Sequence, residues 1–227
     1  MLNLKRHVLL ALAGMAVLIA IGTPRSAIAL DFSDIAQEGQ LRFLSNHPDP
    51  GSYAYDSRVR IDEESFHSGV VSLQTCHRKL DPIRKIVIAF NPKRLMALEI
   101  ASAEGVGTVE VKGHHVEMTN VTRGASICIN LQSKALDRVD DQTYRLQAGP
   151  LMRRYLDGYL PMQANLRFEW PRNSLRLKST NPAPQEGVRL FSAEGNAELD
   201  MIFAGRLLAN IDLVKTPASS GTSQDDK

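Results

Sequence analysis

The sequence predicts an all-β protein: an antiparallel β-sandwich or an open β-barrel-like sheet with one or two short helices. Three observations lead to this prediction. Apolar residues recur with a period of two through most of the chain after residue 30, which is typical of half-buried strands. Turn residues separate these runs, and helical periodicity is confined to two short segments.

The first 29 residues have the pattern of an export signal. Lys5 and Arg6 precede an uncharged apolar run over residues 8–22, and Ala27-Ile28-Ala29 is the small-x-small pattern behind which a signal peptidase cuts. The run is shorter than the roughly twenty residues that a membrane-spanning helix needs. We therefore expect a cleaved signal peptide (1–29), a single β-rich domain (30–215) and a disordered C-terminal tail (216–227). The mature protein would then be periplasmic or secreted, with no transmembrane segment.

Removal of the signal changes the charge balance. The whole chain has 27 Lys and Arg against 25 Asp and Glu, and residues 1–29 contain three of the basic residues and no acid. The mature chain therefore carries 24 basic and 25 acidic side chains. No basic run remains to bind phosphates, so nucleic-acid binding is not expected.

The two cysteines are expected to form a disulfide. Cys76 and Cys128 are the two cysteines of the chain, and the chain is predicted to enter an oxidising compartment, where an even number of cysteines favours disulfide formation. The bond would close a loop of 53 residues, which on chain entropy contributes at most about 4 kcal/mol. The pair lacks the C-x-x-C spacing of redox-active thiols, so a structural role is favoured.

Strands follow one another along the mature chain. Residues 53–61 and 71–77 alternate between apolar and polar side chains, as a half-buried strand does. Residues 86–90 are apolar at every position, which predicts a central strand covered on both faces. Residues 109–118 predict a hairpin with its turn at Lys112-Gly113-His114.

The second half predicts two short helices and three further strands. Pro150 starts an i, i+4 apolar pattern that reaches Tyr159, with Arg153 and Arg154 as an exposed basic pair, and a weaker helical candidate spans 132–139. Residues 164–170 alternate and are followed by a turn and a returning strand at 175–177. The run 197–213 would be roughly 55 Å long as one straight strand, so a bend is expected at Gly205.

Histidine and methionine side chains offer candidate copper or zinc ligands, because imidazole and thioether groups suit these metals. The candidates are His67, His77, His114, His115 and Met118. No H-x-H, H-x-x-x-H or H-E-x-x-H spacing places two of them on one face. In a strand, His77 points away from its neighbour Cys76, so a buried, hydrogen-bonded histidine is favoured over a Cys–His nucleophile.

Two further groups of side chains are candidates for ligand binding or catalysis. Tyr53 and Tyr55, beside the loop that contains His47, could stack on a ligand, although packing on the inner sheet face is favoured. Acids at 62–64 and at 137–141 could serve a hydrolase whose catalytic residues are dispersed in sequence, but their neighbours indicate solvated turns.

These patterns favour an exported, non-catalytic β-domain that acts as a binding or accessory protein and needs no cofactor. Its partner would be another envelope protein or an extended ligand, since long strands have edges that accept a further strand. A copper- or zinc-binding accessory protein and a hydrolase remain as alternatives.

The export prediction specifies the mature protein. We expect the exported chain to begin at Leu30 and to contain no free thiol. Intact mass of the protein from the periplasmic fraction of an expressing bacterium, after alkylation with and without reductant, should show residues 30–227 with two alkyl groups added only after reduction. Retention of residues 1–29, or alkylation without reductant, would contradict this prediction.

Overall fold

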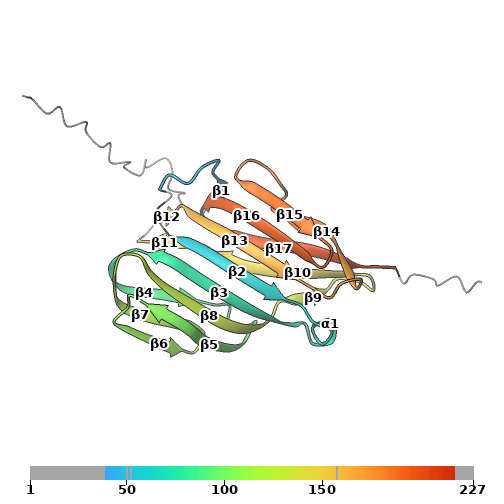
Figure 1. Cartoon of the computed structure of the whole chain (residues 1–227), viewed down its shortest axis with the longest axis horizontal. Coiled ribbons are helices and arrows are strands. Elements are labelled where there is room, and N and C mark those ends of the chain that lie inside the picture. The colour runs from blue at the N-terminus through green and yellow to red at the C-terminus, as the bar shows by residue number, and fades with distance from the viewer. Residues whose placement is uncertain (1–38, 50, 52, 157, 218–227) are drawn as a thin grey trace, which may run out of the picture.

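The computed structural model describes residues 39–217 except 50, 52 and 157, and this part of the chain is nearly all β (Figure 1). The predicted signal peptide, and the predicted C-terminal tail from residue 218 on, lie outside it. The one helix of the described part is α1 (Ser65–Ser68), and no helix there is long and apolar enough to cross a membrane. The strands are β1 (Arg42–Phe43), β2 (Ala54–Arg60), β3 (Val70–Leu80), β4 (Ile83–Ala89), β5 (Leu95–Glu104), β6 (Thr108–Lys112), β7 (His115–Val121), β8 (Ala125–Lys134), β9 (Leu136–Arg138), β10 (Thr143–Leu151), β11 (Arg153–Tyr155), β12 (Gly158–Leu160), β13 (Met162–Glu169), β14 (Leu175–Asn181), β15 (Val188–Ala193), β16 (Asn196–Ala204) and β17 (Leu207–Lys215).

The strands form one large sheet, two smaller sheets and a hairpin. The large, eight-stranded sheet has the order β1-β16-β13-β2-β3-β8-β5, with β15 also paired to β16. The smaller sheets are β14-β17-β10-β9 and β4-β7-β6, and β11 pairs with β12. The pairing of β2 with β13 is parallel, whereas the others in the described chain are antiparallel.

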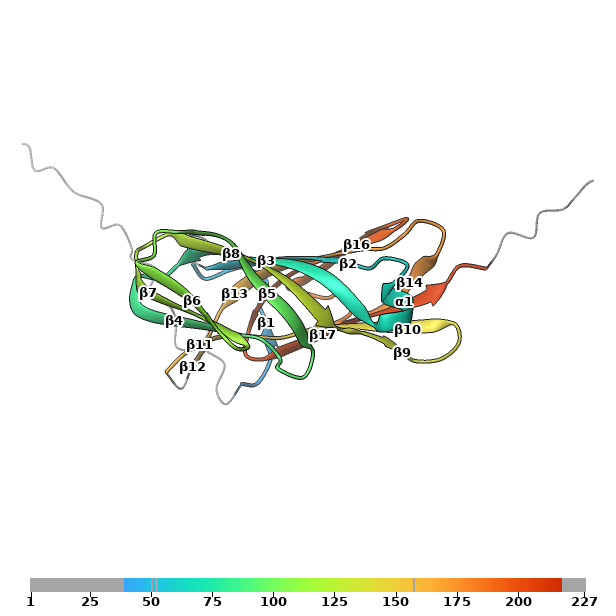
Figure 2. The same ribbon diagram turned by 90° about the horizontal axis from the view of Figure 1, so that it is seen from below.

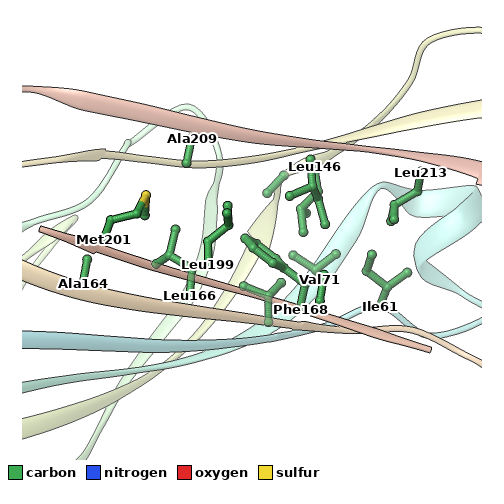
Figure 3. Close-up of a cluster of buried hydrophobic side chains, with 14 of the residues drawn as sticks. Ile61, Val71, Leu146, Ala164, Leu166, Phe168, Leu199, Met201, Ala209 and Leu213 are labelled. Carbon is green, nitrogen blue, oxygen red and sulfur yellow. The ribbon is translucent and has the colours of Figure 1, made fainter. Parts of the chain in front are cut away.

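The two smaller sheets cover different parts of the same face of the large sheet (Figure 2). Beneath β16, β13 and β2, the four-stranded sheet encloses the larger core, in which Leu146, Ala209 and Leu213 face Phe168 and Leu199 (Figure 3). Beneath β8 and β5, the three-stranded sheet encloses a second core. The predicted sandwich is therefore confirmed, with one continuous layer facing two separate ones.

The predicted disulfide is present and joins β3 to β8. Cys76 is bonded to Cys128, and the two residues are direct register partners in these strands. Their neighbours Thr75 and His77 are buried, whereas the cysteines are half-buried on the opposite, outer face of the sheet. The bond therefore links adjacent strands on the outer face, and Cys76 and His77 point apart as predicted.

Gly205 is the corner at which the chain changes layers. The bend predicted there is confirmed: β16 belongs to the eight-stranded sheet and β17 to the four-stranded sheet. Gly205 has φ +103°, and a Cβ added to it would lie 2.2 Å from the backbone oxygen of Gln40. Only glycine fits, because the conformation and the close approach both exclude a side chain.

Four local predictions are wrong. Residues 150–156, 158–160 and 132–139 form strands and their connections rather than helices, because cross-strand pairing, such as Leu151 with Leu207, overrides the weak helical pattern. β4 is an edge strand with Val87 51% exposed, so it is not covered on both faces. β14 does not return along β13, because it lies in the opposite layer and pairs with β17.

Substitution of Gly205 should test the corner. We expect Gly205→Ala to lower the free energy of unfolding by about 3 kcal/mol or more, because the methyl group meets the Gln40 backbone in a disfavoured conformation. Gly113→Ala is the matched control: Gly113 has φ +61° with nothing within 4 Å of the added Cβ, so only the backbone cost of about 1 kcal/mol applies. Urea unfolding measures the free energy of unfolding of both variants. Equal losses of stability in the two variants would contradict the role assigned to Gly205.

Candidate functional site

The outer face of the eight-stranded sheet carries two adjoining hollows. The larger, about 690 Å³, lies over β2, β3, β8 and β5. The smaller, about 500 Å³, lies over β2, β13, β16 and the turns beside them. Arg58 lines both. Strand alternation produces this surface, because apolar side chains of one parity enter the cores and polar side chains of the other parity face outward.

A carboxylate shared by two arginines separates the two hollows. Glu169 Oε1 lies 2.8 Å from Arg58 Nε, and Glu169 Oε2 lies 3.1 Å from Arg60 Nε. The parallel pairing of β2 with β13 makes this possible, since Arg60 is the direct register partner of Glu169. The three groups together carry one net positive charge, and the arginine side chains remain 45% and 64% exposed.

Amide side chains line the larger hollow next to these arginines. Gln74 Nε2 donates to Asn130 Oδ1 at 3.2 Å across the β3–β8 pair, and Gln132 lies two residues further along β8. Ser72 and Glu99 complete the polar rim. The hollow therefore offers both donors and acceptors of hydrogen bonds, with a guanidinium pair at one end.

The smaller hollow has its own fixed ion pair. Arg167 donates from Nε and Nη2 to Glu198 Oε2 at 3.2 and 2.9 Å, and Asn165 donates to Glu198 Oε1 at 2.6 Å. The Asn165 hydrogen bond, with the Arg167 charge, lowers the pKa of Glu198. Arg172 and Glu194 line the same hollow, so its charges are balanced.

A second polar cluster is buried beneath the same sheet, between the two cores. The Tyr53 hydroxyl lies 2.7 Å from His77 Nδ1, and the Tyr55 ring meets the imidazole edge-on at 5.1 Å. Burial lowers the pKa of His77 to about 4 and raises the pKa of Tyr55 to about 12. The imidazole is therefore neutral, and its Nδ1 shares one hydrogen bond with the Tyr53 hydroxyl. Nε2 and Thr75 Oγ1 are buried without a hydrogen-bond partner in the described chain.

Arg153 covers this cluster, contrary to the prediction of an exposed basic pair. Its side chain is 14% exposed, pairs with Asp81, donates to the Pro161 carbonyl at 3.0 Å and lies 5.6 Å from the centre of the Tyr53 ring. Burial and the Arg153 charge lower the pKa of His47. The structure thus groups the predicted ligand residues Tyr53 and Tyr55 with His77, in a packed interior. The inner-face packing favoured for the two tyrosines is observed.

The candidate metal ligands lie apart. His67 is in α1, His77 is enclosed under the sheet, and Met118 is fully buried in the second core. The rings of His114 and His115 meet edge to face at the β6–β7 turn, and His115 Nε2 lies 3.6 Å from Glu117 Oε1. Among residues that the structure describes, no three His, Cys, Asp or Glu side chains are placed to hold a metal ion.

The acids considered for a hydrolase lie away from both hollows, and all but one of them are in exposed turns. The exception is Asp137, which lies in β9 and pairs with Arg94 at 2.9 Å. Asp62 accepts hydrogen bonds from the backbone and hydroxyl of Ser65, which lower its pKa. Asp140 accepts from the backbone of Gln142 and Thr143. Both carboxylates cap turns, as their neighbours in the sequence indicated.

Sequence reasoning missed the outer-face arginines and amides. A signal was present, because Arg58, Arg60 and Gln74 occupy the polar parity of strands whose other parity was recognised as apolar. The alternation identifies which side chains face outward. It does not reveal that β13, more than a hundred residues later, pairs with β2 and brings Glu169 to Arg58 and Arg60.

Comparisons with known proteins add no family. No family model and no curated protein matches the chain. Among solved structures, an M1 zinc metallopeptidase from Deinococcus radiodurans is similar at 12% identity and TM-score 0.35, over 81% of this chain and 44% of that one. Legionella pneumophila aminopeptidase A, in complex with aspartic acid, is similar at 10% identity and TM-score 0.39, over 77% and 23%. The chain spans less than half the length of these structures, and likeness at this level carries no argument.

The buried histidine should make stability depend on pH. The unfolded chain protonates His77 near pH 6.5, whereas the native protein does so only near pH 4, so stability falls as the pH drops between these values. Between about pH 7.5 and pH 5, we expect this group to remove about 2 kcal/mol from the free energy of unfolding. Urea unfolding of His77→Gln should lose that part of the dependence. His114→Gln, in the exposed turn, is the control, and equal pH dependence in the wild type and both variants would contradict the assignment.

Proposed function

We propose that the protein is exported to the periplasm and acts there as a non-catalytic binding protein, which holds an extended, acidic peptide on the outer face of the eight-stranded sheet. The observation that carries the proposal is the Arg58–Glu169–Arg60 cluster between two adjoining hollows. Export agrees with the disulfide, because such bonds persist in oxidising compartments.

The chemistry of the hollows supports a peptide that carries carboxylates. Arg58 and Arg60 each use Nε on Glu169, so one carboxylate holds both guanidiniums in place, and this group of three carries one net positive charge. Glu99 lies on β5, in the larger hollow, so a ligand carboxylate would bind at the arginines of β2 rather than along the whole hollow. Guanidinium groups bind carboxylates by paired, charge-assisted hydrogen bonds. The Gln74, Asn130 and Gln132 amides beside them match the donors and acceptors of a peptide backbone.

An extended ligand fits better than a compact one. The two hollows adjoin at Arg58 and together cross β16, β13, β2, β3, β8 and β5, so an occupant would run across the strands. Trp170 is the one aromatic residue among the described residues that line them, and it is 6% exposed, with its indole N–H bonded to the Leu175 carbonyl at 2.8 Å. An aromatic platform for a sugar ring is therefore not available, which favours a peptide.

The alternative functions have less support. A copper or zinc protein would need ligands that meet at one point, and the described candidates do not. A hydrolase with dispersed acids would need Asp62, Glu64 or Asp140 in a cleft, and these line neither hollow. Elemental analysis of the purified, dialysed protein tests the metal alternative, since stoichiometric copper or zinc would favour it over the binding protein.

Binding of an oligoglutamate peptide tests the proposal. We expect the wild type to bind a fluorescent six-residue glutamate peptide, and the double variant Arg58→Gln, Arg60→Gln to bind it at least about tenfold more weakly, because two charge-assisted contacts are lost. Fluorescence anisotropy at low salt measures both.

The matched control removes a different arginine from the same face. Arg189 is 70% exposed and pairs with Asp200, but lines neither hollow, so Arg189→Gln should bind like the wild type. A neutral six-residue glutamine peptide separates carboxylate recognition from general peptide binding. Equal affinity of the wild type and the double variant for the acidic peptide, or no binding by the wild type, would overturn the proposal.

A further inference from the structure

Exposed apolar side chains gather at one corner of the molecule, on the side opposite the hollows. We call this group the apolar corner: Leu41, Met152, Tyr155, Leu156 and Leu208. Leu156 is 79% exposed and Tyr155 54% exposed. Exposed apolar groups of this size mark contacts with a protein or a membrane when they lie together.

Pairing and packing bring these residues together. Leu151 and Leu207 are register partners whose side chains turn inward, so the next residues, Met152 and Leu208, face outward from the four-stranded sheet. Leu41 approaches the same place, because its Cα lies 2.9 Å from where a Cβ of Gly205 would be. Figure 2 shows the β11–β12 hairpin projecting from this side of the molecule.

The hairpin presents its apolar end on a rigid support. Arg153, in the first strand, is held by Asp81, the Pro161 carbonyl and the Tyr53 ring. At the turn, Arg154 Nε donates to the Leu156 carbonyl at 3.1 Å. Leu156 has φ +51°, a conformation that costs a branched side chain about 1 kcal/mol or more relative to glycine. A leucine at this position costs free energy twice, because its backbone conformation is disfavoured and its apolar side chain is exposed to water. Such a residue is expected where the side chain contacts something other than its own domain.

Basic side chains surround the apolar corner. Arg154 precedes the exposed pair at the turn, Arg206 precedes Leu207, and Arg42 follows Leu41, and all three are exposed. Tyrosine and leucine side chains flanked by arginines are typical of surfaces that bind a membrane interface. The apolar groups enter the boundary between headgroups and acyl chains, and the guanidinium groups bind anionic lipids.

The path of the chain leads to the same corner. The described part begins at Gly39, whose carbonyl accepts a hydrogen bond from the Arg206 backbone at 3.1 Å and whose position adjoins the Tyr159 ring. The 38 residues before it include the apolar run of the predicted export signal. The chain therefore enters the described part beside the β11–β12 hairpin.

We propose that the apolar corner docks on an anionic membrane surface, with Tyr155 and Leu156 entering the interface. A membrane is favoured over a protein partner because the exposed pair projects on a hairpin rather than lining a groove, and because the three arginines Arg42, Arg154 and Arg206 outnumber the one acid beside the pair in sequence, Asp157. In this arrangement the outer face of the eight-stranded sheet points away from the lipid, so the docking site is independent of the peptide site.

Position-specific quenching tests the docking. The exported protein, purified as the cell produces it, carries Tyr155→Trp, and Trp170 is its buried fluorescent background. We expect vesicles in which roughly one lipid in three is phosphatidylglycerol, with brominated acyl chains, to quench the tryptophan at position 155. Phe191→Trp is the matched control, because Phe191 is 57% exposed on the opposite face and should not be quenched.

Partition measurements test the two parts of the contact. In flotation with the same lipids unbrominated, Tyr155→Ser with Leu156→Gln should lower the vesicle-bound to free ratio roughly tenfold. Raising NaCl from about 0.05 to about 0.5 M, or using phosphatidylcholine alone, should also weaken binding, because the arginine contribution is screened or lost. Vesicle-bound protein without quenching at position 155, equal quenching at 155 and 191, or no binding would each overturn the proposal. Absence of binding would leave a protein partner for the corner.

Discussion

The pairing of β3 with β8 is the constraint on which the rest of the molecule depends. β3 contributes Val71 to the larger core and Leu80 to the second, so it is the strand that the two halves share. The Cys76–Cys128 bond fixes the register of this strand against β8 from the outer face. Because a one-residue slip would exchange every inward and outward side chain, this register also places the Gln74 and Asn130 amides in the larger hollow.

The junction between the two cores is polar, although it lies in the interior of the sandwich. Tyr53 packs against both cores and its hydroxyl meets His77, so the junction is held by a hydrogen bond where the apolar packing changes partner. A buried polar group without a hydrogen bond lowers the stability of the fold. His77 Nε2 and Thr75 Oγ1 are two such groups, because they lack hydrogen-bond partners within the described chain. Arg153, in the β11–β12 hairpin, contacts the Tyr53 ring and pairs with Asp81. These contacts hold the hairpin over the junction and so connect the polar interior with the apolar corner.

Sequence patterns predicted local features better than pairings. The disulfide, the inward direction of His77, the bend at Gly205 and the capping role of Asp62 were all predicted, because each follows from strand parity, cysteine count or turn chemistry. The helix at 150–160 was wrong because its i, i+4 pattern is short and competes with pairing to β17. The outer-face site was missed because Arg58, Arg60 and Glu169 become neighbours only through the parallel β2–β13 pair.

The sequence by itself determined which side chains face inward, because that depends on a period of two along each strand, and it determined the cysteine pair, because only one pairing exists. Tertiary structure alone decided which strands are neighbours, that one sheet faces two, and where exposed side chains gather. The physical reason is range: parity is a property of adjacent residues, whereas the contact of Arg60 with Glu169 spans 109 residues and the closeness of Leu41 to Gly205 spans still more. Such contacts arise only when the apolar faces of the sheets are buried together.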